Sequence, residues 1–215
     1  DYPLRQEEIW RWLIIKSRKS PFGKLRVMLS EAEASKVKSQ KFESALGQLV
    51  KEKICGVKNS FYFLSGREEI VELRKLREEW SIPKIKRAKR IARILKFLPW
   101  VKLIGITGGL AQNNSHKDDD IDLFFITSRQ RVWLTRGLTV LILRLLRLYR
   151  RPGKIADMIC PNMFITEESL RMQPEDLFIA HEVCQLKPIF VRNRTYQRFL
   201  KANLWVRKFL PNWKP

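Results

Sequence analysis

The chain has 215 residues, 45% of them hydrophobic, and a formal net charge of +21. That length allows one large or two small domains with a buried core. The excess of positive charge favours a polyanionic partner, either nucleic acid or an anionic membrane surface. The three cysteines are odd in number and far apart, and there are only two histidines, which argues against a disulfide framework and against a structural zinc site.

Residues 1–66 predict a small separate domain. Three segments carry apolar residues at helical spacing or a helix N-cap: Glu7–Arg18, Glu31–Lys36 and the residues from Ser39 onward. Two short β-rich segments joined by a turn then predict a hairpin: Ile54–Val57 and Phe61–Leu64. Three helices followed by a hairpin resemble a winged helix, which implies docking of nucleic acid or protein. A plain packing or dimerisation domain is the alternative.

Residues 67–98 predict a basic helical linker. The charged helix over Arg67–Trp80 is expected to break near Pro83. The next segment, Lys84–Lys96, holds seven basic residues and no acid, with its apolar residues on one helical side. Faces that are merely solvated usually mix both signs of charge, so this face predicts contact with nucleic-acid phosphates. The candidate contact residues are Lys84, Lys86, Arg87, Lys89, Arg90, Arg93 and Lys96.

A glycine pair between two apolar strands is followed by alternating acids. Val101–Thr107 predicts a buried strand that ends at Gly108-Gly109. After ten residues come Asp120 and Asp122, at the start of a second apolar strand. Residues i and i+2 of a strand point to the same face, about 6 to 7 Å apart, so the two carboxylates can share divalent cations.

The glycine pair allows a sharp turn and a close approach of backbone to an anion. Together with the loop before the acids, it predicts a nucleotide-binding segment. The candidate nucleotide-binding residues are Gly108, Gly109, Asn113, Ser115 and Lys117. An acidic surface loop that happens to follow a glycine turn is the alternative.

These residues resemble the signature of the DNA polymerase β-type nucleotidyltransferase superfamily. That signature is an apolar residue, Gly, Gly or Ser, a gap of roughly ten residues, then Asp-apolar-Asp/Glu-apolar. Here it is Thr107-Gly108-Gly109 and Asp120-Ile121-Asp122-Leu123, and Thr107 is less apolar than the pattern prefers. The resemblance covers about residues 99–190. It implies an α/β fold with a mixed sheet flanked by helices, and two Mg²⁺ ions held by the acids.

The resemblance also implies a third carboxylate on a later strand. Asp157, in the apolar run Lys154–Ile159, is the best match, and Asn162 is a rival that would bind metal poorly. Asp120, Asp122 and Asp157 are therefore the candidate catalytic and metal-binding residues. The alternative for Asp157 is a charge on an edge strand that faces water.

The apolar segment Val132–Tyr149 contains three arginines and is too short and too charged for a membrane span. We interpret it as the crossover helix between the second and third strands. An amphipathic helix at a membrane interface is the alternative.

A basic, aromatic extension over residues 191–215 ends the chain. Lys187–Pro215 contains eight Lys or Arg and no acid, with aromatic residues between them. Cations beside aromatic rings suit a nucleic-acid single strand, whereas rings buried in the core are the alternative. Before this extension, Pro174–Leu186 predicts a helix that carries His181 and Glu182. A structural histidine is favoured there over a general base.

The sequence as a whole predicts a Mg²⁺-dependent nucleotidyltransferase. It would move a nucleoside monophosphate from a nucleoside triphosphate to a hydroxyl of a nucleic-acid 3′ end, with RNA such as tRNA favoured, and release pyrophosphate. One alternative is a non-catalytic nucleic-acid-binding or regulatory protein on the same fold. Another is a nucleotidyltransferase that modifies a protein or a small molecule. A cytoplasmic location without stable membrane insertion is expected.

Overall fold

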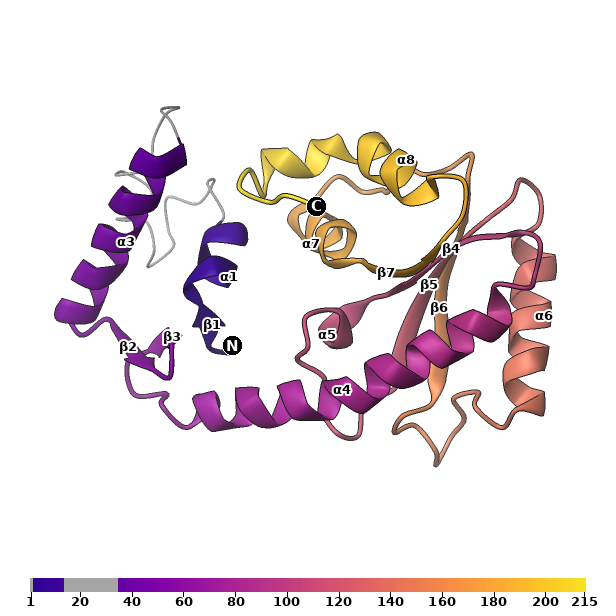
Figure 1. The fold of residues 1–215 in the computed structure, drawn as a ribbon, viewed down its shortest axis with the longest axis horizontal. Helices are drawn as coiled ribbons and strands as arrows, with labels where there is room; N and C mark the ends of the chain where they lie inside the picture. Colours follow the sequence, from indigo (N-terminus) through magenta and orange to yellow (C-terminus); the bar gives the residue numbers. More distant parts are fainter. Residues whose placement is uncertain (1, 14–34) are drawn as a thin grey trace. The chain divides into compact units, whose positions relative to one another are not determined.

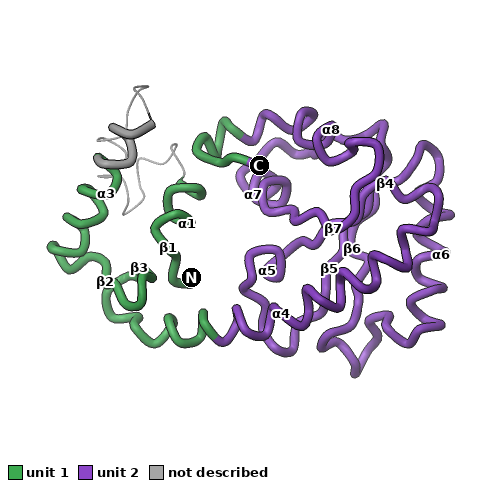
Figure 2. The backbone as a smooth tube through the Cα atoms, in the orientation of Figure 1, with its two compact units in different colours: residues 1–75, 207–214 green, residues 76–206, 215 purple. Residues whose placement is uncertain are grey.

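The computed structural model describes residues 2–13 and 35–215, and divides the chain into two compact units (Figure 2). One unit contains residues 1–75 and 207–214, and the other contains residues 76–206 and 215. The predicted helix over residues 31–36 lies almost entirely outside the described residues, as does the second half of the helix expected over residues 7–18. No helix in the described ranges is both long and apolar enough to cross a membrane.

The first unit contains a small antiparallel sheet and two described helices. Its elements are β1 (Leu4–Arg5), α1 (Gln6–Arg11), α3 (Ser35–Lys51), β2 (Cys55–Lys58) and β3 (Phe61–Leu64). The strand order is β1-β3-β2, which confirms the predicted hairpin and adds a two-residue strand that had no sequence signal. Phe42, Leu46 and Leu49 of α3 form its core. Residues 207–214 join this unit, where Asn212 donates a hydrogen bond to the carbonyl of Trp10.

Helix α4 (Ile70–Leu95) is continuous through Pro83, so the predicted break is wrong. Proline lacks the N–H that a helix would use at this position, and its ring crowds the preceding turn. Its neighbours hold the helix in place here. Ser81 donates its hydroxyl to the carbonyl of Arg77, and Ala88, Ile91 and Leu95 are buried in the core. Tertiary packing therefore outweighs the local cost of the proline.

The second unit is built on a four-stranded mixed sheet, which confirms the predicted fold class. Its strands are β4 (Val101–Ile106), β5 (Ile121–Thr127), β6 (Ile159–Thr166) and β7 (Lys187–Val191), in the order β6-β5-β4-β7. Strand β4 is antiparallel to both β5 and β7, and β5 is parallel to β6. The parallel pair requires a crossover, and α6 (Val132–Leu145) supplies it as predicted.

Helices cover both faces of this sheet (Figure 1). On one face, Ile91 and Leu95 of α4 and Leu143 of α6 pack against Leu123 and Phe125. The other face carries α7 (Leu177–Gln185) and α8 (Thr195–Ala202), and the ring of Phe124 contacts that of Phe199 in α8 at 5.7 Å. Because side chains alternate along β5, Asp122 shares the face of Phe124.

Three of the C-terminal aromatic residues are buried, and the others are partly buried. Phe199, Trp205 and Trp213 are all at least nine-tenths buried. Trp205 lies in a short 3₁₀ helix, η1 (Leu204–Lys208), and its indole N–H donates to Asn203. These three rings are therefore unavailable to stack on bases, and the packing alternative holds for them.

Candidate functional site

Four strand ends meet at one edge of the second unit's sheet. Strand β4 ends at Ile106, whose partners are Leu123 on β5 and Lys187, the first residue of β7. Because β6 is parallel to β5, its first residues lie at the same edge, and Cys160 is the partner of Asp122. Residues separated by more than fifty positions in the sequence are thus brought together by the sheet register alone.

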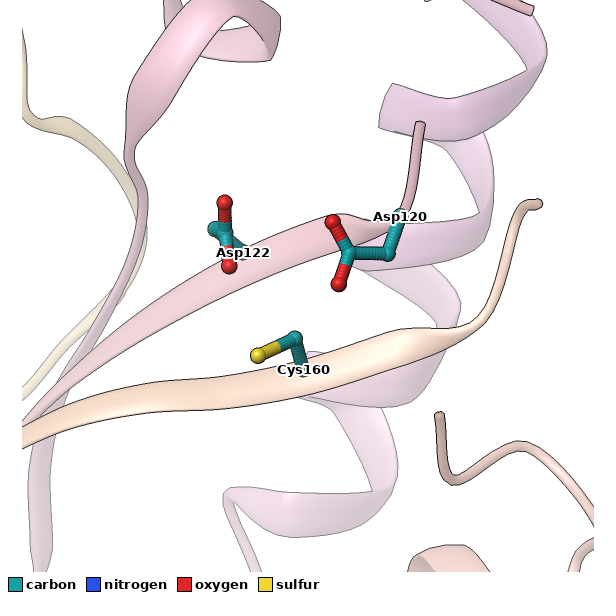
Figure 3. Close-up of side chains that lie close together, drawn as sticks. All are labelled: Asp120, Asp122 and Cys160. Atoms are coloured by element: carbon teal, nitrogen blue, oxygen red, sulfur yellow. The ribbon is translucent and has the colours of Figure 1, made fainter. Parts of the chain in front are cut away.

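Asp120, Asp122 and Cys160 form a compact group at this edge (Figure 3). One ligand atom from each, two carboxylate oxygens and the sulfur, all lie within 4.8 Å of one another. Among the residues that the structure describes, no other three His, Cys, Asp or Glu side chains come this close together. The structure therefore brings together the two acids predicted from the alternating pattern, and adds a thiol.

The glycine turn lies directly against the Asp122 carboxylate. The N–H of Thr107 donates to the backbone carbonyl of Asp122 at 3.2 Å, and Gly108, with a φ of +65°, then begins the one-turn helix α5 (Gly108–Ala111). A Cβ atom on Gly108 would stand 3.6 Å from Asp122 Oδ2, and one on Gly109 would stand 3.1 Å from the carbonyl oxygen of Asn114. Glycine is required here both for the left-handed backbone and for the tight fit. The hydroxyl of Thr107 is buried and has no hydrogen-bond partner.

Burial and like charge govern the acids of the group. Burial raises the pKa of Asp122, and the neighbouring charge of Asp120 raises it further. Arg150 Nη1 lies 3.0 Å from Asp120 Oδ2, yet that oxygen is buried and receives no hydrogen bond. The guanidinium instead directs a hydrogen toward Cys160 Sγ, 3.9 Å away. Burial and the charge of Asp122 raise the pKa of Cys160 to about 11, so the thiol keeps its proton at neutral pH.

These donors fit one hard divalent cation. Two carboxylates offer the oxygen ligands that Mg²⁺ prefers, and Asp120 Oδ2 is also ion-paired with Arg150 at 3.0 Å. A cation between them would also relieve the repulsion that raises the pKa of Asp122. Cys160 does not fit Mg²⁺, because a thiol must lose its proton to bind metal and its sulfur suits softer ions.

Glu182, Lys187 and Asn113 complete the surroundings of the group. Burial raises the pKa of Glu182, on α7, and the charge of Asp122 contributes. Lys187 Nζ donates to Asn113 Oδ1 at 3.0 Å, and burial lowers the pKa of Lys187. The sequence marked Glu182 only as part of a His-Glu pair on a helix. It gave no sign that this carboxylate feels the charge of Asp122.

The setting of Asp157 differs from the strand position expected from the sequence. Asp157 lies in the turn before β6, with a φ of +60°, and not on the strand. Its carboxylate forms an ion pair with Lys84 at 3.2 Å, and its N–H donates to the carbonyl of Asp119. Cys160 occupies the strand position opposite Asp122, and the role of Asp157 as a third ligand stays a prediction. The rival Asn162 is an exposed residue further along β6.

Two of the predicted phosphate contacts are used inside the protein. Lys84 is only 2% exposed, and its ammonium donates to the backbone carbonyls of Lys117 and Asp119. Arg87 donates to the carbonyl of Asp157 at 3.0 Å. These residues of α4 hold the loops that flank the acids, which removes Lys84 from the nucleic-acid surface. Lys86, Lys89, Arg90 and Arg93 are exposed, whereas Arg87 and Lys96 are partly buried.

The predicted nucleotide-binding loop divides in the same way. Ser115 is buried, where its N–H donates to Ser81 and its hydroxyl contacts Asp119 at 3.3 Å. It therefore organises the loop and is not placed to reach a ligand from solvent. Lys117 is exposed, and Asn113 is exposed with a φ of +52° beside Lys187.

Comparisons with known proteins give only distant likenesses. One solved structure, "Crystal structure of the toxin-antitoxin with AMP-PNP", contains a chain that is 15% identical to this one. The match has a TM-score of 0.34 and covers 54% of this chain and 82% of that chain. A mutant of the toxin-antitoxin MntA-HpeT is 14% identical, with a TM-score of 0.32 over 53% and 78%. No protein-family model and no curated protein matches the sequence. At these scores the site has to be judged by its own geometry.

Proposed function

We propose that this protein is a cation-dependent nucleotidyltransferase. One observation carries the proposal: the Gly108-Gly109 turn, bare of side chains, lies against Asp122 at the same sheet edge as Asp120. The carboxylates that can bind a cation therefore lie next to a stretch of backbone that a phosphate can approach closely. Transfer from a metal-bound triphosphate requires both features. Exposed Lys and Arg side chains of the same unit attract the phosphates electrostatically.

Each residue has a proposed task. Asp120 and Asp122 would hold one Mg²⁺, which would supply positive charge against the triphosphate and the reacting phosphorus. Gly108 and Gly109 let the phosphates approach the backbone, and Lys187 with Asn113 borders the same edge. We propose one cation rather than the two expected from the sequence. The reason is that Cys160, a protonated thiol, occupies the position on β6 where a third carboxylate was expected.

Glu182 is the proposed general base. The acceptor hydroxyl attacks the α-phosphorus, the bond to the bridging oxygen breaks, pyrophosphate leaves, and the hydroxyl proton passes to the Glu182 carboxylate. Its raised pKa brings that carboxylate closer to the range in which general bases work at neutral pH. Cys160 is a poor candidate, because its raised pKa leaves almost no thiolate at neutral pH.

A nucleic-acid hydroxyl is the proposed acceptor, with RNA favoured. Lys86, Lys89, Arg90 and Arg93 form an exposed row on α4, and the charge of Lys89 lowers the pKa of Lys187 at the site. The cationic row therefore acts electrostatically on the sheet edge that carries Asp120 and Asp122. Nucleic acid bound along this row would have its phosphates neutralised close to the site.

A second function is favoured by one contact. Arg150 lies 3.0 Å from Asp120, where it competes with a cation for that carboxylate. Combined with a cysteine at the third position, this arrangement suits a nucleotide-binding or regulatory protein that performs no transfer. The two functions differ in a single observable, which is the release of pyrophosphate.

The test uses triphosphates labelled at the α-phosphorus. The parent protein is incubated with Mg²⁺, each of the four triphosphates, and separate pools of RNA, DNA oligomers and protein. Label in RNA or DNA, matched by released pyrophosphate and lost in Asp120→Asn and Asp122→Asn, supports the proposal. Label only in protein contradicts the nucleic-acid acceptor, and triphosphate binding without any transfer favours the regulatory protein.

A further inference from the structure

Helix α6 of the second unit has its large apolar residues on the outside. Its buried side consists of Thr135, Thr139 and Leu143, and the hydroxyls of both threonines lack hydrogen-bond partners. By contrast, Trp133 is 81% exposed and Leu145 is 74% exposed. A helix that served only to cover the sheet would place these side chains the other way round.

The outward residues form a continuous strip. Trp133, Gly137, Leu141 and Leu145 are spaced four apart, which aligns them along one face of the helix. Leu134 widens the strip, at 42% exposure. Single exposed apolar residues are ordinary, but an aligned set headed by a tryptophan indicates a surface that binds something.

Basic residues predominate in the sequence around the strip. Residues 123–156 contain eight Lys or Arg and no Asp or Glu. Within α6, Arg136 lies over the ring of Phe164 at 5.5 Å, and Arg144 lies over the ring of Tyr149 at 5.3 Å. Both guanidinium groups are exposed and are held beside the strip by these rings.

We propose that α6 is a membrane-surface helix that binds anionic lipid. Aliphatic side chains and a tryptophan on one face of a helix that contains arginines and no acid match the chemistry of the boundary between lipid headgroups and acyl chains. The arginines pair with anionic headgroups while Trp133, Leu141 and Leu145 enter the apolar layer. The helix lies on the surface and does not span the membrane, in keeping with its 14 residues.

A nucleic acid is a less suitable ligand for this strip, because leucine side chains form no hydrogen bonds or ion pairs with phosphates. A protein partner would need an acidic rim around an apolar groove, and it is distinguished from lipid by the test. The proposal is independent of the catalytic edge, since none of these residues belongs to the carboxylate group or the glycine turn.

The test is flotation of the full-length protein with vesicles. One set is phosphatidylcholine, and the other contains phosphatidylserine in addition. The parent should float with the anionic vesicles and remain unbound with the neutral ones. The double variant Trp133→Ala/Leu145→Ala keeps the net charge of the parent. It should bind anionic vesicles at least about tenfold more weakly, because only the apolar side chains that enter the membrane are removed.

Phe178→Ala is the matched control, since Phe178 is 70% exposed on α7, away from α6. Its binding should equal that of the parent. Equal binding by parent and double variant would overturn the proposal, because the net positive charge alone would then explain flotation. Failure of the parent to float, or a concentration-dependent dimer that the double variant abolishes, would also overturn it, the latter in favour of a protein interface.

Discussion

Glu182 is a half-buried carboxylate, and its ionisation has a measurable consequence. Its pKa is raised from an ordinary 4.5 by burial and by Asp122. The folded protein thus holds this proton more tightly than the unfolded chain does. The free energy of unfolding therefore falls as pH rises from about 4.5 through the folded pKa, and the loss is complete above it.

Glu182→Gln should remove that dependence. At pH 7 the variant should melt at a higher temperature than the parent, and the difference should vanish below about pH 4.5. Transfer should fall about 10² to 10⁴-fold, the usual contribution of a general base. Melting curves between pH 4 and 8, together with turnover, check both expectations. A melting difference that is constant with pH, or unchanged turnover, would contradict the assignment.

Lys84 and Asp157 form an ion pair whose two members should behave differently on substitution. Lys84→Met leaves the carbonyls of Lys117 and Asp119 without their buried donor, at about 1–3 kcal/mol each. Asp157→Asn should cost at most about 1 kcal/mol, because its carboxylate is 45% exposed and Lys84 keeps both carbonyls. Chemical denaturation of the two variants measures these costs. A large loss of stability in Asp157→Asn would show that the ion pair matters more than the carbonyls.

Asp157 also shows what the sequence could not reveal. An isolated acid in an apolar run looks like a strand residue, but a turn with a left-handed backbone at Asp157 delays the strand until Ile159. Cys160 enters the site only because β6 pairs with β5 in a particular register. Strand register across a crossover depends on tertiary packing, and no local pattern encodes it.

At the scale of elements, α6 shows an unusual division of residues between its two sides. Thr135 and Thr139 are fully buried against the sheet, and neither hydroxyl finds a partner. Thr135→Val and Thr139→Val keep the shape and remove the buried hydroxyl. Each should raise the free energy of unfolding by about 1 kcal/mol.

Thr195→Val is the matched control for these two variants. Thr195 is equally buried, but its hydroxyl donates to the carbonyl of Arg192, so the same substitution should destabilise the protein. Denaturant titration of the three variants compares them directly. A loss of stability of the same size in all three would show that the α6 hydroxyls are satisfied in solution.

Element boundaries were predictable where local chemistry sets them. Strand β5 follows from its apolar run after the acids. Helix α7 was expected from Pro174 but begins at Leu177, where Asp176 caps it by accepting a hydrogen bond from the N–H of Ile179. Local rules fail at α4, where Pro83 predicts a break. Burial of Ala88 and Ile91 on its packed side keeps that helix continuous.

At the scale of the whole molecule, the candidate site is the product of four strand ends. The alternating acids and the glycine pair were visible in the sequence, because both belong to one hairpin-like segment of the chain. Cys160, Glu182 and Lys187 came only with the fold, since each lies on a different later element. The return of residues 207–214 to the N-terminal unit was likewise hidden, because no local pattern links this segment to that unit.

The central claim is that Asp120 and Asp122 hold a divalent cation that binds a triphosphate beside the glycine turn. Mn²⁺ is a spectroscopic substitute for Mg²⁺, and electron paramagnetic resonance counts its free and bound fractions. The titration is performed with and without each of the four nucleoside triphosphates. Parent, Asp120→Asn/Asp122→Asn and Asp157→Asn proteins are compared. We expect the parent and Asp157→Asn to bind one Mn²⁺ per chain more tightly with a triphosphate, and the double variant to lose this binding. Equal binding by the double variant, or its loss in Asp157→Asn alone, would contradict the claim.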